Sequence, residues 1–513
     1  MKSKIENYLL FIVLLLVHVV WLYTIREQIA PELVFPVWLL SNTSTFVSEV
    51  QTMYPLGLFY LVNFIYSLTE YLRLSFYLVH IAIVISLDSL LYFYLKSKFG
   101  FKNAVSGFLF YIIWQVFFRG NYLWFDLATI PFIALSFFSF SSYVKKQRQK
   151  DLLLASLFLS MGVFFKNTIM WIFILYLIWA IILTLKKQPF LKNVLNNILI
   201  LISPLVLAII SNFLLLTAKS TFDFSFYWSI IMAYIIFPRL QGLSRFIAPS
   251  YLPVIFILLG FYLMSCLIIA KLSKKSTHEK WFLYTFTLAA FANVFPRWSD
   301  FHLQPFVFFL AIIVTYALSL KKFLSRRDRF CVNASQVALF LLTFAVIGNR
   351  ILVEIKLAKL PKIDHLGEFT QSSFTPKLSG KSVFAYDLPF YNYESKDNSI
   401  SVDSFTLFKL MITNPDLFYH MTSPQVALSY LEAKNPDFVF IPDHIQNRII
   451  TGASLTGFEK IITKKYHLES TIGTLYSQKS SAYSQKSSAY SQKSSAYSQK
   501  SSAYFVYSLN SVK

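Results

Sequence analysis

Long apolar runs, divided by short basic clusters, dominate the first 350 residues of the chain. Most runs have roughly 15 to 24 residues, enough for a helix to cross about 30 Å of hydrocarbon. They predict a polytopic α-helical membrane protein with eleven spans. The expected spans are residues 8–24, 75–95, 103–118, 126–143, 152–165, 168–185, 194–217, 251–270, 281–295, 305–320 and 331–348.

Two further apolar stretches, residues 54–68 and 222–238, are interpreted as non-spanning. The first is short and opens with a proline and a glycine, and either one would invert the charge pattern of all later loops if it crossed. We expect both to be interfacial or re-entrant helices on the outer face.

Basic residues set the expected orientation. The 47 Lys and Arg exceed the 25 Asp and Glu, a net charge of +22, but they gather in short loops between apolar runs. This distribution is typical of a topology signal rather than of nucleic-acid binding. With the N-terminus inside as a retained signal anchor, every cluster falls in the cytoplasm. The clusters are residues 96–102, 145–150, 186–192, 271–280 and 321–329.

The composition changes after the transmembrane domain, residues 1–349, and predicts a small extracytoplasmic α/β domain over 350–513. Short strand-like runs such as "KSVFAYDL" and "DFVFIPDH" support it. Four copies of YSQKSSA fill residues 476–503, and removing them joins "STIGTLY" to "YFVYSLN". The repeat is therefore interpreted as an expanded hairpin loop, because it is too polar to build a core.

Charged side chains interrupt the apolar pattern at three outer turns, where basic residues are disfavoured. Seven residues separate Arg119 from Asp126, a spacing that on a helix places both on one face. Lys166 lies within a 34-residue apolar stretch that is too long for one crossing and so turns near Lys166. The third turn, "FPRWSDFHLQPF", carries Arg297, Asp300 and His302.

The first outer loop, residues 25–74, adds the carboxylates Glu32 and Glu49 as candidate catalytic groups. Carboxylates and cations thus meet on one membrane face. This arrangement suits chemistry in which Arg and Lys hold an anionic lipid-linked head group while a carboxylate deprotonates a hydroxyl. Alternatively, Arg119 and Arg297 are interfacial anchors and Lys166 is a tolerated turn residue.

Three residues inside apolar runs receive no catalytic role. Asp88 lies toward the cytoplasmic end of its span, and we expect it to make an internal hydrogen bond. Cys266 and Cys331 lie within apolar runs, so the loops contain no disulfide framework.

An ordered set of segments within residues 1–350 resembles bacterial GT-C membrane glycosyltransferases, the superfamily of the protein O-mannosyltransferases and the lipid A aminoarabinose transferase. The segments are "PELVFPVWLLSN", "SEVQTMYPLGLFYL", "GNYLWFDLATIPFIALSFF", "SMGVFFKNTIMW" and "FPRWSDFHLQPFVFFLAI". The resemblance implies that a first-loop acid is the base and that later basic residues hold the lipid phosphate. Glu32 and Glu49 take the positions of the family's acids, with Glu where Asp is usual.

The sequence therefore predicts an inverting glycosyltransferase in the plasma membrane. It would move a sugar from a polyprenyl-phosphate donor to a hydroxyl of a lipid, glycan or protein. No motif indicates a cofactor, and a divalent cation is left open. A flippase or transporter of lipid-linked sugars, and a surface-polysaccharide polymerase or ligase, are the alternatives.

Overall fold

The computed structural model describes fifteen stretches of the chain. These are residues 2–24, 37, 55–118, 120–121, 123–185, 188–215, 252–273, 276–292, 300–358, 383–385, 400–401, 435, 437–442, 457–472 and 504–509. The chain divides into two compact units. The first comprises Met1–Ile29, Tyr54–Leu216 and Phe226–Leu360, and the second Ala30–Met53, Thr217–Ser225 and Pro361–Lys513.

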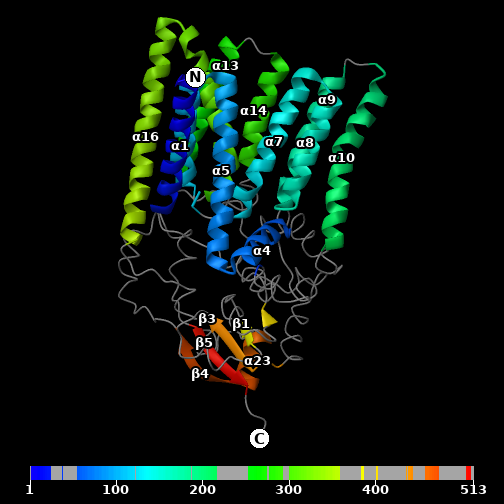
Figure 1. Ribbon diagram of the computed structural model, residues 1–513, viewed down its shortest axis with the longest axis vertical. Helices are drawn as coiled ribbons and strands as arrows, with labels where there is room; N and C mark the ends of the chain where they lie inside the picture. Colours follow the sequence, from blue (N-terminus) through cyan, green and yellow to red (C-terminus); the bar gives the residue numbers. More distant parts are fainter. Residues whose placement is uncertain are drawn as a thin grey trace. The chain divides into compact units, whose positions relative to one another are not determined.

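The first unit is a bundle of long helices that run side by side (Figure 1). Its α-helices are α1 Lys2–Thr24, α4 Gly57–Thr69, α5 Leu72–Phe99, α6 Phe101–Phe117, α7 Phe125–Lys146, α8 Gln149–Val163, α9 Trp171–Thr184, α10 Phe190–Leu215, α13 Leu252–Leu272, α14 Thr277–Phe291, α15 Gln304–Leu320 and α16 Arg326–Ala358. The 3₁₀-helices are η1 Asn167–Met170, η6 Asp300–Leu303 and η7 Lys321–Phe323.

Each of the eleven expected spans coincides with one of these helices. Within the described residues, six helices are long and apolar enough to cross a membrane, judged by length and composition. They are α5, α7, α10, α13, α15 and α16. The apolar stretches Tyr8–Tyr23, Gly57–Thr69 and Thr168–Thr184 are shorter. The chain is thus built as an integral membrane protein, and the number of crossings stays a prediction.

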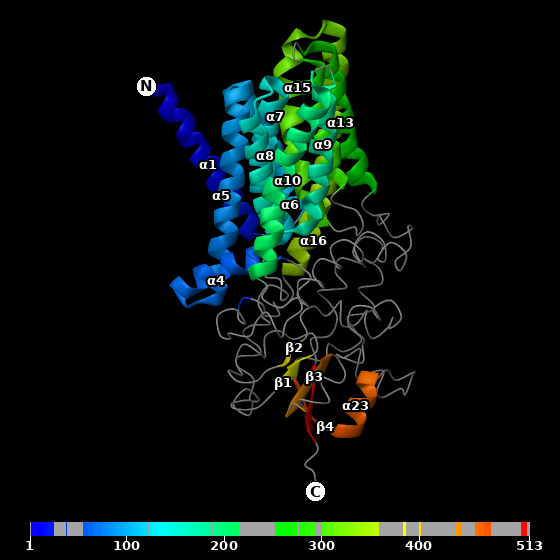
Figure 2. The ribbon, with the colours of Figure 1, turned by 90° about the vertical axis from the view of Figure 1, so that its right-hand side faces the viewer.

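Helix α4 is the first stretch expected not to span. It has 13 residues, about 20 Å at 1.5 Å per residue, which is too short for the hydrocarbon layer. It lies at a steep angle to the long helices, at the end of the bundle where α5 begins (Figure 2). The second such stretch, residues 222–238, lies outside the described residues.

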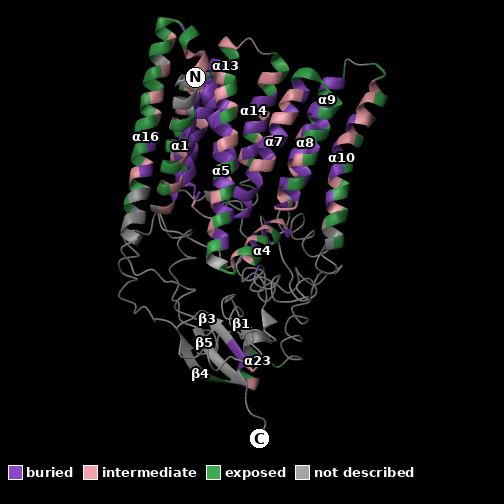
Figure 3. Cartoon of the chain, viewed as in Figure 1, coloured by how far each residue is buried: buried purple, intermediate pink, exposed green. Residues whose placement is uncertain are grey.

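Helix α15 occupies the centre of the bundle. In its apolar window 83% of residues are buried, against 22% in α10 and 18% in α16, so the latter two present their apolar faces outward (Figure 3). Close approach of helices replaces the hydrophobic effect as the source of association in lipid. Gly107 of α6 permits such an approach, since a Cβ there would lie 1.7 Å from Oγ1 of Thr315 in α15.

The second unit contains a five-stranded sheet in the order β2-β1-β3-β5-β4. The strands are β1 Val383–Ala385, β2 Ile400–Ser401, β3 Phe438–Pro442, β4 Tyr466–Ile472 and β5 Tyr504–Leu509, and helix α23, Gly457–Lys465, precedes β4. β1 is parallel to β2 and β3, whereas β5 is antiparallel to β3 and β4. The predicted hairpin pairing is present, with Ile472 opposite Tyr504.

Candidate functional site

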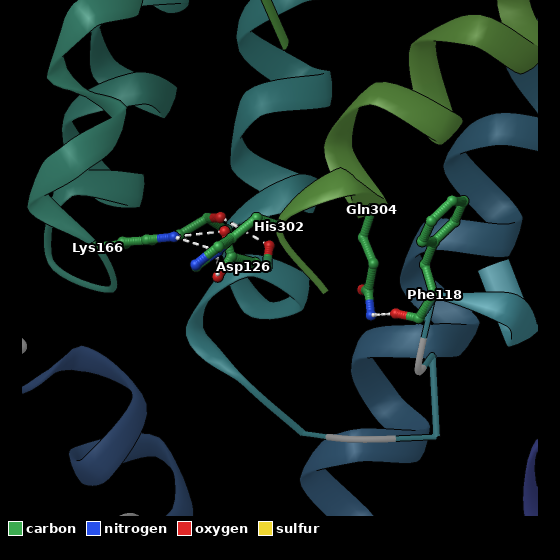
Figure 4. A network of polar contacts seen from close by, with 6 residues as sticks. Phe118, Asp126, Lys166, His302 and Gln304 are labelled. Carbon is green, nitrogen blue, oxygen red and sulfur yellow. Dashed lines mark hydrogen bonds and ion pairs between the residues drawn. The ribbon is translucent and has the colours of Figure 1, made fainter. Parts of the chain in front are cut away.

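Three charged or titratable side chains from distant segments meet at the end of the bundle where α7 begins. Asp126 lies in the first turn of α7, Lys166 between α8 and η1, and His302 in η6 just before α15. All three point toward one another (Figure 4). The structure therefore brings together three of the eight residues that the sequence nominated.

Local backbone structure explains each position. Helix α7 begins after the extended Trp124, so Asp126 lies at the N-terminus, where the helix dipole favours a negative charge. Lys166 is extended, with φ −157° and ψ 112°, and separates α8 from η1 and α9. The 34-residue apolar stretch does turn at Lys166, as predicted. His302 lies in the short 3₁₀ turn that leads into α15.

The Asp126 carboxylate bridges the other two groups. Its Oδ1 accepts a hydrogen bond from the Lys166 ammonium, and its Oδ2 lies 2.9 Å from Nδ1 of His302. Because a carboxylate only accepts, Nδ1 of His302 carries the proton. The 3.4 Å contact between Nζ of Lys166 and Nδ1 of His302 therefore joins two donors, which the carboxylate holds together.

The cluster is almost withdrawn from solvent. The side chains of Asp126, Lys166 and His302 are 2%, 7% and 14% exposed. Burying charges is costly, and a pair such as this persists only when each group keeps its partners. With a neutral imidazole the cluster has one positive and one negative charge, and the Asp126 carboxylate fixes the position of the Lys166 ammonium.

A second tie joins the same segments. Gln304, which is 1% exposed, donates from Nε2 to the carbonyl of Phe118 at 2.8 Å (Figure 4). Gln304 follows His302 by two residues, and Phe118 opens the turn that leads to Asp126. The ends of α6, α7 and α15 are thus held in one arrangement around the cluster.

Helix α4 is anchored to the Lys166 turn. The backbone N–H of Gly57 donates to the carbonyl of Phe164 at 2.8 Å. A Cβ at Gly57 would lie 2.5 Å from that carbonyl oxygen, so glycine is required for this approach. Phe59 then packs edge-on against Phe125, with ring centroids 5.5 Å apart.

The remaining nominated residues are not placed by the described residues. Glu32, Glu49, Arg119 and Arg297 lie outside them, and Asp300 is described only as the first residue of η6. Their roles stay predictions. Within the described ranges, no group of three or more His, Cys, Asp or Glu is arranged to hold a metal ion.

The spacing considered for positions 119 and 126 does not fall within one helix, because α6 ends at Phe117 and α7 begins at Phe125. Helical periodicity cannot apply across the turn between them. The motif "FRGNY" contains the signal for this break, since Gly and Asn favour turns over helix.

Sequence reasoning missed Gln304 and Gly57. Each had a weak signal, Gln304 as an amide before an apolar run and Gly57 after a proline. The internal hydrogen bond expected for Asp88 is present, because its Oδ2 lies 2.7 Å from Nδ1 of His18. His18 itself was not nominated.

Comparisons with known proteins agree with the fold. Residues 54–215 match the family model of dolichyl-phosphate-mannose-protein mannosyltransferase. The structure is similar to that of ArnT from Cupriavidus metallidurans in the apo state, with a TM-score of 0.51 and 10% identity, over 88% of this chain and 95% of that chain. It is also similar to the same protein bound to undecaprenyl phosphate, with a TM-score of 0.57 and 8% identity, over 90% of this chain and 96% of that one.

A more distant likeness, with a TM-score of 0.44 and 10% identity, is to the archaeal oligosaccharyltransferase AglB from Archaeoglobus fulgidus in complex with an inhibitory peptide and a dolichol-phosphate. It covers 85% of this chain and 69% of that chain. Among curated protein sequences none matches this chain significantly.

Proposed function

Since the chain has the fold of the GT-C membrane glycosyltransferases, we propose that it transfers a sugar from a polyprenyl-phosphate donor to an extracytoplasmic hydroxyl. The observation that carries the proposal is the buried Lys166 ammonium, fixed by Asp126 beside His302 at one end of the bundle. An ammonium held in this way suits a lipid phosphate at the membrane surface. The structure of ArnT with undecaprenyl phosphate supports the same class of ligand.

In the proposed reaction the acceptor hydroxyl attacks the anomeric carbon from the face opposite the phosphate. A new C–O bond forms and the bond between the anomeric carbon and the phosphate oxygen breaks. The configuration at the anomeric carbon is inverted. The hydroxyl proton passes to the carboxylate of Glu32 or Glu49. Polyprenyl phosphate leaves with the bonding electron pair.

The cations stabilise the charge that develops on this leaving group. Lys166 neutralises one phosphate oxygen, and Asp126 keeps both Lys166 and His302 in place. Arg297 is proposed as a clamp that engages two phosphate oxygens, with Arg119 and Asp300 contributing to the same donor site.

The proposed orientation follows the distribution of basic residues. Eleven crossings put the N-terminus in the cytoplasm and the 350–513 domain outside, with the donor site at the outer face of the plasma membrane. The acceptor would be a lipid, a glycan or a protein.

The test is a donor screen with the full chain in nanodiscs and in sealed vesicles, using radiolabelled polyprenyl-phosphate sugars and lipid, glycan and peptide acceptors. We expect release of polyprenyl phosphate together with a labelled product, and loss of most of this turnover in Arg297→Ala. If labelled donor crosses sealed vesicles without any sugar transfer, the protein is a transporter and the proposal is wrong.

A further inference from the structure

A second series of hydrogen bonds connects the end of α1, the third turn of α5 and the turn between α6 and α7, near the proposed donor site. The Tyr23 hydroxyl lies 2.8 Å from Nδ1 of His80, and Nε2 of His80 lies 2.7 Å from the carbonyl oxygen of Gly120. Tyr23 is the second-last residue of α1, His80 lies in α5, and Gly120 lies in the turn between α6 and α7. None of these three residues belongs to the cluster of Asp126, Lys166 and His302.

The direction of each hydrogen bond is fixed by its partners. A carbonyl oxygen only accepts, so Nε2 of His80 carries the proton and donates to Gly120. In a neutral imidazole the other nitrogen is an acceptor, so Nδ1 accepts a hydrogen bond from the Tyr23 hydroxyl. His80, which is only 3% exposed, thus accepts a hydrogen bond from Tyr23 and donates one to Gly120.

The Gly120 turn is held from three sides. Besides the bond from His80, the N–H of Gly120 donates to the Gln115 carbonyl at 2.9 Å. Gln304 holds Phe118, two residues earlier. A Cβ at Gly120 would lie 1.9 Å from Oε1 of Gln115, so the turn has no room to shift toward α6.

One end of this series of hydrogen bonds leads to the proposed phosphate-binding cations. After Gly120, six residues lead to Asp126, which positions Lys166 and His302. The other end, Tyr23, belongs to the last turn of α1. His80 therefore links the end of α1 to the turn that leads to Asp126.

We propose that His80 is a positioning residue, which holds the turn that leads to Asp126 against the end of α1 through Gly120 and Tyr23. This inference rests on the proposed function. The position of Lys166 and His302 relative to the leaving phosphate affects the rate of the proposed transfer, and a misplacement of about 1 Å can cost about 100-fold. His80 would affect turnover without touching the substrate.

The experiment compares glutamine and asparagine at position 80, because their amides reach the places of different ring nitrogens of the histidine. In His80→Gln the side-chain nitrogen reaches the place of Nε2, so the bond to Gly120 survives. In His80→Asn the amide reaches only the place of Nδ1, which keeps Tyr23 and loses Gly120. We expect His80→Leu and His80→Asn to lower kcat about 10- to 100-fold. His80→Gln should lower kcat less, to the level of Tyr23→Phe, because both variants lose only the hydrogen bond to Tyr23. Donor KM should change less than about threefold.

Tyr262→Phe is the matched control. It removes a tyrosine hydroxyl that donates to the backbone carbonyl of Tyr284 at 3.1 Å, in α13 and outside the segments that His80 joins. We expect it to lower the melting temperature as much as Tyr23→Phe does while leaving kcat unchanged. Tyr23→Phe should lower kcat in the parent and add nothing in His80→Leu.

Equal kcat in the Gln and Asn variants, or a fall in kcat that Tyr262→Phe reproduces, would overturn the proposal. Melting temperatures supply a readout that does not depend on the reaction. If Tyr23→Phe and His80→Leu lower the melting temperature additively, the three residues are not one unit and the inference fails. If instead the parent protein transfers no sugar while the two changes remain non-additive, it is the proposed function that fails.

Discussion

At the scale of single residues, Lys166 is the strongest test of the site. Replacing it by methionine removes the cation and leaves the carboxylate of Asp126 buried, which costs about 3–5 kcal/mol of stability for a pair of this kind. We therefore expect Lys166→Met to lower both the melting temperature and donor turnover, the latter by about 100-fold or more. Steady-state kinetics and thermal unfolding measure the two effects.

A second substitution separates stability from activity. In Asp126→Asn with Lys166→Met no charge is left unpaired, so the melting temperature should return toward that of the parent while turnover stays lost. Lys271→Met is the control, because Lys271 also pairs with an aspartate, Asp328, but is 61% exposed. Such exposed pairs contribute about 1 kcal/mol or less. Recovery of turnover in the double variant would assign Lys166 a purely structural role.

At the scale of elements, the contact between α4 and the Lys166 turn predicts a steric effect. In Gly57→Ala the new methyl group meets the backbone carbonyl of Phe164, and this backbone has no rotamer through which to move away. We expect a loss of about 1–3 kcal/mol in stability and a lower turnover, because the turn that carries Lys166 is displaced.

Gly348→Ala serves as the comparison, since a Cβ there meets nothing within 4 Å and lies inside helix α16. Alanine is favoured over glycine in a helix by about 1 kcal/mol, so this variant should match or exceed the parent in thermal stability. Unchanged turnover and melting temperature in Gly57→Ala would show that α4 is not tightly docked.

The β4–β5 pairing makes a prediction about the repeat. Ile472 is opposite Tyr504, so deletion of 476–503 leaves Gly473, Thr474 and Leu475 as the connection. Three residues with a glycine are a common hairpin loop. The deletion variant should therefore fold and turn over donor as the parent does. A fall of more than a few degrees in its melting temperature would mean that the repeat stabilises the protein.

At the scale of the whole molecule, the distribution of basic residues predicts the side on which the C-terminal domain lies. A reporter that is active only in the cytoplasm, fused after Lys513, should be silent, because an odd number of crossings from an internal N-terminus ends outside. An active reporter would require an even number and would move the proposed donor site to the other face.

The sequence predicted the helices well because one physical requirement, the thickness of hydrocarbon, fixes the length of each apolar run. It also placed Asp126, Lys166 and His302 on one side, since the spans alternate. It could not pair them, because which side chains meet depends on how helices pack, 40 and 176 residues apart. For the same reason the sequence did not predict the hydrogen bonds of Tyr23, His80 and Gln304, because their partners are set by how the helices pack.

The bridging carboxylate has a consequence for synthesis of the protein. A ribosome produces Asp126 first, Lys166 forty residues later and His302 only after a further 136 residues. The first two can pair as soon as α7 and α8 lie side by side, which shields both charges while the rest of the chain is still being inserted. The imidazole and the Gln304 tie arrive with α15. A chain interrupted before that helix thus carries the ion pair without His302 and Gln304, and we expect such a product not to bind the proposed lipid-linked donor.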